Sequence, residues 1–193
     1  MVVELLEALG WPMDRPAADA LAAAILSDTG WMRFSNTDAR ACRALADLLE
    51  RGVQVDQLYK LLYQCDRVER IRLLVRMLES LELHCEDRLA VMSVRRDDFE
   101  QTGARPDETE NLINEALRLE TVEIVALLVE NEHEIRVSLR SRDHVDVARI
   151  ARAFGGGGHA RASGARVERD HDDLKQRLIA ACAGALREAG LMR

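Results

Sequence analysis

The stretch Gly155-Gly156-Gly157-Gly158-His159-Ala160-Arg161-Ala162-Ser163-Gly164 decides the fold of the second half of this 193-residue chain. Four consecutive glycines leave a length of backbone without side chains, so a ligand can approach the amide groups closely, as in loops that bind phosphate. His159 offers an imidazole donor next to them. Four bare glycines also suit a flexible linker. The helical spacing of apolar residues before them and the alternating Ala165-Arg166-Val167 after them favour a binding loop.

Composition and charge limit the kinds of partner. The 27 basic and 34 acidic residues give a net charge of −7, which argues against a broad basic surface for long duplexes but allows a small anion pocket. Aromatic residues make up 4% of the chain, so a base-stacking platform of several rings is not expected. No apolar run approaches the roughly 18–20 residues of a membrane span, and no membrane partner is expected.

The four cysteines, Cys42, Cys65, Cys85 and Cys182, show neither C-x-x-C pairing nor metal-ligand spacing. Such a set is typical of reduced thiols, and we expect most of them to be buried. With no signal peptide evident, the sequence favours a cytoplasmic protein.

The first part of the chain reads as helical. Asp14-Arg15-Pro16 is a helix start signal, and the last of the predicted helices places Ile71, Leu74, Val75 and Leu78 inward. The predicted helices cover Met1–Leu9, Arg15 to about Leu26, the segment from Thr37 to Gly52, Asp56–Gln64 and Val68–Leu83.

The pattern changes near His84. The residues from 134 to 140 alternate between apolar and polar, which indicates a strand with Ser138 and Arg140 on one face. The elements expected here are strands at Leu89–Val94, Val122–Glu130 and Glu134–Arg140, an amphipathic helix at Pro106–Leu119, a helix before the glycines, and a short strand and a final helix after them.

The run from Gly156 to Gly164 resembles the GGGH-x-x-A-A-G signature of the DHHA1 domain, the substrate-binding half of the DHH/DHHA1 phosphoesterases. Ser163 departs from it, where the signature usually has a second alanine. The resemblance implies an α+β protein with a mixed sheet. Residues 1–65 would be the C-terminal part of a DHH domain, 66–85 a connecting helix, and 86–193 the DHHA1 domain.

Asp28 lies in Ser27-Asp28-Thr29-Gly30. One interpretation is a helix that ends in a polar turn. An aspartic protease D-T-G motif needs strands around it, and here helices are predicted on both sides. Residues 25–37 are also similar to the stretch around the last metal-binding aspartate of the DHH domain. The resemblance therefore implies that Asp28 is a catalytic carboxylate ligand of a divalent metal, usually Mn²⁺.

The family's mechanism is two-metal hydrolysis of a phosphoester, which one carboxylate cannot support. The D-x-D motif, a further aspartate and the D-H-H triplet of the family have no counterpart in this sequence. We therefore expect a fragment or late start, a partner chain that supplies the missing half, or a degenerate binding module, in that order. The 193-residue chain alone is expected to have little or no activity.

Ser138-Leu139-Arg140-Ser141 resembles the S-x-R-S strand end that faces the glycine loop in the family. An ordinary solvated strand face is the alternative. The implied substrate-binding residues are Ser138, Arg140, Ser141, Gly155, Gly156, Gly157, Gly158 and His159, with His159 also donating to phosphoryl oxygens during catalysis.

The resemblance thus implies the C-terminal portion of a metal-dependent phosphoesterase that hydrolyses short oligoribonucleotides, 3′,5′-bisphosphorylated adenosine (pAp), or both. The alternative is a nucleotide-binding module without catalysis. The expected partners are a short RNA or nucleotide substrate and, because the first helix lacks a cap and leaves apolar surface, a second copy in a homodimer.

Overall fold

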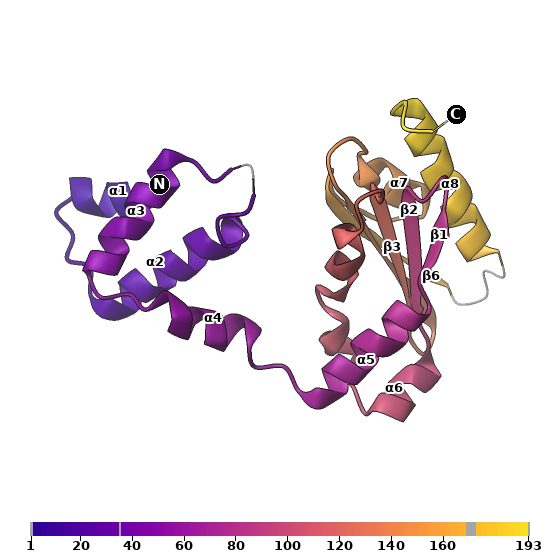
Figure 1. Cartoon of the computed structure of the whole chain (residues 1–193), viewed down its shortest axis with the longest axis horizontal. Helices are drawn as coiled ribbons and strands as arrows, with labels where there is room; N and C mark the ends of the chain where they lie inside the picture. The colour runs from indigo at the N-terminus through magenta and orange to yellow at the C-terminus, as the bar shows by residue number, and fades with distance from the viewer. Residues whose placement is uncertain (1, 35, 169–172, 193) are drawn as a thin grey trace. The chain divides into compact units, whose positions relative to one another are not determined.

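A computed structural model describes residues 2–34, 36–168 and 173–192. The chain divides into two compact units, residues 1–66 and residues 67–193, and each is described by itself (Figure 1).

The first unit is helical, as the sequence predicts. Asp14 and Asp38 accept main-chain hydrogen bonds from Ala17 and Ala41 and so cap the second and third helices. Its helices are α1 (Val2–Ala8), α2 (Arg15–Asp28), α3 (Ala39–Glu50) and α4 (Val55–Tyr63). Three alanines pack among larger residues in its small core, which consists of Val3, Ala18, Ala22, Ala44, Leu48 and Val53.

Three aromatic rings gather in this unit, which the composition did not lead us to expect. Tyr59 and Tyr63 stack with their ring centroids 5.3 Å apart, and the ring of Trp31 meets both edge-on at 5.0 and 5.5 Å. The cluster forms because Tyr59 and Tyr63 are one helical turn apart on α4. Trp31 and Met32 both adopt positive φ in the turn after α2.

The second unit is an α+β structure with a mixed six-stranded sheet in the order β1-β2-β3-β4-β6-β5, which confirms the predicted fold class. Strands β2 and β3 are parallel, and every other neighbouring pair is antiparallel. The strands are β1 (Glu82–His84), β2 (Leu89–Val94), β3 (Ile124–Glu130), β4 (Glu134–Ser141), β5 (Gly157–His159) and β6 (Ala162–Glu168). The helices are α5 (Val68–Glu79), α6 (Arg96–Thr102), α7 (Val147–Ala153) and α8 (Leu174–Glu188), with 3₁₀ turns η1 (Pro106–Thr109) and η2 (Leu112–Arg118).

Each face of the sheet has its own hydrophobic core. Helices α7 and α8 cover one face, where Val137 and Leu139 of β4 point, and α8 contributes Leu178 and Cys182 to that core. Helix α5 and the turn η2 cover the other face over β2 and β3. Because side chains alternate along a strand, Ser138 and its polar neighbours on β4 lie on this second face.

Helix α5 differs from the prediction in length and in its buried side. It ends at Glu79 rather than continuing to Leu83, because the Ser80 hydroxyl bonds to the main chain of Ser93 on β2 and fixes the helix end there. Leu73 and Met77 are the buried side chains of this helix. Of the four residues expected to point inward, Leu74 is partly buried against the core, whereas Ile71, Val75 and Leu78 are 40–51% exposed.

Two further predictions of secondary structure were wrong. The segment 106–119 forms the turns η1 and η2 instead of one α-helix, because Asn111 between them adopts a left-handed φ of 63°. The end of the glycine run is strand β5 rather than a loop, since Gly157–His159 pairs with Ala162–Gly164.

The cysteines are less buried than expected. Cys42 and Cys65 are exposed, Cys85 is half-buried, and Cys182 is buried. Burial raises the pKa of Cys182 to about 12. Within the described residues, no helix has the length and apolar character needed to cross a membrane.

Candidate functional site

The candidate site is the polar face of the sheet over β4, β6 and β5. Directly opposite residues of antiparallel strands point to the same side. Arg140 is opposite Ala162, which in turn is opposite His159. The register therefore places Arg140 and His159 on one face with only a methyl group between them. The sequence predicted both residues, and the structure brings them together.

Arg140 is the cation best suited to hold a ligand on this face. Its side chain is partly buried, and the hydrogen bond that it donates goes to the main-chain oxygen of Leu139 at 3.1 Å. Burial lowers the pKa of Arg140. No carboxylate of the described residues forms an ion pair with it. A partly desolvated guanidinium without a carboxylate partner is poised to bind an anion in two-pronged fashion.

Ser138 shares the next row of the same face with two glycines. It is opposite Gly164, and Gly164 is opposite Gly157. A Cβ added at Gly157 would meet nothing within 4 Å, so this position is open. The row therefore offers one hydroxyl on a floor otherwise free of side chains.

The first two glycines have structural roles at the end of α7. Gly155 has a φ of 74° and caps α7, with its amide donating to Arg152 O at 3.1 Å. The Gly156 amide donates to Ala151 O at 2.9 Å. The sequence predicted these amides as phosphate donors, but both are already paired within the helix end.

Ser141 does not lie with Ser138 and Arg140. It follows Arg140 by one residue, so its side chain points to the opposite, buried face. Its hydroxyl donates to Val145 O at 2.6 Å and is 3.3 Å from Ala160 O. Ser163, which replaces an alanine of the signature, is buried as well and donates to Val147 O at 2.8 Å. Both hydroxyls hold the loop and helix next to the site in place.

Two arginines that the sequence reasoning missed lie on the polar face. Arg136 on β4 is directly opposite Arg166 on β6. They line a hollow of about 410 Å³ together with Ser138, Gly155, Gly156 and Gly164, a size within the usual range for small-molecule sites. The alternation on β4 that singled out Ser138 and Arg140 also places Arg136 on their face, and that signal was available in the sequence.

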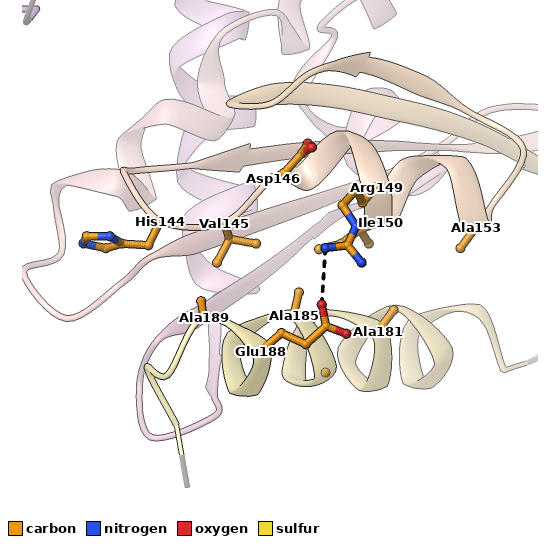
Figure 2. Close-up of a pocket in the computed structure, with 11 residues that line it drawn as sticks. His144, Val145, Asp146, Arg149, Ile150, Ala153, Ala181, Ala185, Glu188 and Ala189 are labelled. Atoms are coloured by element: carbon orange, nitrogen blue, oxygen red, sulfur yellow. Dashed lines mark ion pairs between the residues drawn. The ribbon is translucent and has the colours of Figure 1, made fainter.

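A second hollow lies on the other side of the sheet, between α7 and α8 (Figure 2). Alanines line much of it, and an ion pair of 3.3 Å joins Arg149 on α7 to Glu188 on α8. None of the predicted site residues lines this hollow. Because its facing charges satisfy each other, we do not assign a ligand to it.

Asp28 belongs to the first unit, at the end of α2, where its carboxylate is exposed. The Asn36 amide donates to its main-chain and side-chain oxygens, each at 3.1 Å. Within the described residues, no group of three His, Cys, Asp or Glu side chains is arranged to hold a metal ion. Asp28 thus offers one carboxylate, and a metal would need ligands from elsewhere.

The model of the DHHA1 domain matches residues 86–188. The bifunctional oligoribonuclease and PAP phosphatase NrnA of Thermus thermophilus is 31% identical over 193 residues, which is all of this chain and 58% of that protein. The protein of the same name from Bacillus subtilis is 27% identical over 158 residues, 82% of this chain and 50% of that protein. The chain therefore spans about half the length of the curated relatives it matches.

A solved structure supports the fold. The exopolyphosphatase-related protein from Bacteroides fragilis superimposes with a TM-score of 0.85 at 22% identity, covering 97% of this chain and 55% of that one.

Proposed function

The chain belongs to the DHHA1 domain family, and from this premise we propose that it binds short oligoribonucleotides or pAp as the substrate-binding portion of a phosphoesterase. Two relatives carry the name bifunctional oligoribonuclease and PAP phosphatase, which supports this choice of substrates. The ligand's phosphate would lie on the polar face over β4, β6 and β5.

The partly buried Arg140 carries this proposal. Its guanidinium has no carboxylate partner among the described residues, and it shares a face with His159 across Ala162. Leaving a partly buried charge without a partner costs free energy, which a bound anion would recover. His159 and the Ser138 hydroxyl would donate to the remaining phosphate oxygens.

The same proposal includes a divalent cation, and more specifically Mn²⁺. Asp28 would supply one hard oxygen ligand, which suits such a cation. The described residues alone do not fit a complete metal site, because no three of their His, Cys, Asp and Glu side chains are grouped so as to hold a metal ion. We therefore assign Asp28 a ligand role only and attribute no catalytic step to the described residues.

Titration of the 193-residue chain with adenosine 5′-monophosphate tests the proposal. We expect Arg140→Gln and His159→Ala each to weaken binding by about 1 kcal/mol or more, which is roughly fivefold, the scale of a charge-assisted hydrogen bond. His144→Ala is the matched control, because His144 is an exposed histidine that lines the hollow between α7 and α8. Equal affinity of all four proteins would refute the site.

The alternative, a binding module without catalysis, is favoured by the incomplete ligand set around Asp28. Mn²⁺-dependent hydrolysis of a diribonucleotide and of pAp separates the two functions. We expect this polypeptide alone to bind both ligands and to release little or no product. Rapid turnover that Asp28→Asn abolishes would instead show that the chain is a complete enzyme.

A further inference from the structure

The cross-strand pair Arg136–Arg166 is the feature of the polar face that the fold itself does not explain. The two residues are directly opposite each other on β4 and β6. Like charges directly opposite each other repel and destabilise a sheet. Such a pair is tolerated where an anion lies between the two guanidinium groups.

Contacts within the protein compensate this pair only in part. Arg166 forms an ion pair with Glu134, and its side chain is 70% exposed. Arg136 donates to the Thr109 hydroxyl through Nη2, but its buried Nε has no hydrogen-bond partner among the described residues. A buried donor of a charged group without an acceptor is costly, so the protein's own contacts leave the charge of Arg136 incompletely compensated.

The pair lines the hollow of about 410 Å³ described above, next to Ser138. Arg136 and Arg140 are four residues apart on the same face of β4, so their Cα atoms are roughly 13 Å apart. Between them lies the row of Ser138, Gly164 and Gly157. Arg136 and Arg140 thus flank a row that carries one small side chain, that of Ser138. Both arginine side chains are long enough to reach over this row.

We infer that Arg136 and Arg166 form a second phosphate subsite, so that the preferred ligand carries two phosphates separated by one nucleoside. A 3′,5′-bisphosphorylated nucleoside or a 5′-phosphorylated dinucleotide meets this requirement, and a nucleoside monophosphate does not. The inference rests on the proposed function, because it needs the first phosphate to lie at Arg140 and His159.

Calorimetric titrations with adenosine 5′-monophosphate and adenosine 3′,5′-bisphosphate test the subsite. We expect the bisphosphate to bind at least tenfold more tightly to the unaltered chain. In Arg136→Gln/Arg166→Gln this preference should disappear while the affinity for the monophosphate stays within twofold. Arg118→Gln is the control, because the Arg118 side chain is 81% exposed and lies outside the site.

Glu134→Gln gives a change in the opposite direction. It removes the carboxylate that pairs with Arg166, so we expect the bisphosphate to bind several-fold more tightly and the monophosphate to bind unchanged. Should the double variant fail to fold, Arg166→Gln alone is still informative, because an exposed side chain can be shortened safely. We expect it to reduce the preference for the bisphosphate at least threefold.

The outcomes separate this inference from the proposed function. If Arg140→Gln weakens the binding of both ligands but the arginine variants leave the preference for the bisphosphate intact, the second subsite is refuted and the proposed function stands. If Arg140→Gln changes neither affinity, the proposed function is refuted, and the inference with it.

Discussion

Replacing Gly156 by alanine should destabilise the second unit strongly. A Cβ at this position would lie 2.1 Å from Gly164 O and 2.7 Å from both the Cα and the Cβ of Ala165. These are atoms of the paired strand β6, so they cannot rotate away. Either the strand or the end of α7 must shift, and such overpacking costs roughly 1–3 kcal/mol.

The shift would also disturb the bond from the Gly156 amide to Ala151 O, which is 2.9 Å long. One hydrogen bond of this kind contributes about 1 kcal/mol. We therefore expect Gly156→Ala to lower the free energy of unfolding by about 2–4 kcal/mol. At roughly 4 °C per kcal/mol, Tm should fall by about 8–16 °C in differential scanning calorimetry.

Two matched glycines make the experiment specific. At Gly157 and at Gly184 within α8, a Cβ would meet nothing within 4 Å, and φ is not positive. Alanine at either position should therefore keep or raise stability, by about 0.4–1 kcal/mol, because the unfolded chain loses freedom. Gly157→Ala should at the same time weaken nucleotide binding, since its methyl group would occupy the open end of the row that Gly157 shares with Gly164 and Ser138. Equal Tm values for the three variants would refute the assignment of Gly156 to close packing.

Three other perturbations follow from single contacts. Arg142→Ala should lower the free energy of unfolding by about 2–4 kcal/mol in urea denaturation. The reason is that the Arg142 guanidinium donates to three main-chain oxygens within residues 117–120 at 2.7–2.8 Å. A loss below about 1 kcal/mol would contradict this. Asp38→Ala should cost about 1 kcal/mol through loss of the cap of α3, whereas Asp38→Asn should retain most of it. Cys42 is exposed and should react rapidly with a thiol reagent in the folded chain. Cys182 should react only after unfolding, because burial raises the pKa of its thiol to about 12. Rapid labelling of Cys182 in the folded chain would contradict its burial.

The sequence predicted the kind and order of most elements, but for the helices it did not always predict which side is buried. Helix α5 shows why. Its apolar residues form two stripes, one with Ile71, Val75 and Leu78 and one with Leu73 and Met77. Periodicity alone ranks such stripes equally, and the choice is made by packing against β2 and by the bonds of Ser80 to Ser93. Those contacts are 13 residues apart in the chain and lie outside any local pattern.

The polar face was more accessible to sequence reasoning because a strand has a simple period of two. The alternation around Ser138 gives Arg140 its correct side, and the same rule places Ser141 on the buried side despite its place in the S-x-R-S motif. The opposition of Arg136 and Arg166 depends on the register between β4 and β6. Register is a tertiary property, so the like-charge pair becomes evident only in the folded chain.

Most of the glycine run is explained by the backbone packing of the folded protein. Gly155 is required by its positive φ, and Gly156 and Gly158 by backbone atoms of β6 that approach to within 2.7 Å of any added Cβ. Gly157 is the member of the run for which neither reason applies. Three of the four glycines therefore have structural reasons, and in the proposed function the anion is bound by the side chains of Arg140, His159 and Ser138. The close packing of these glycines on β6 keeps His159 in register with Arg140 across Ala162, so in the proposed site the run would act by positioning His159 rather than by offering its amides.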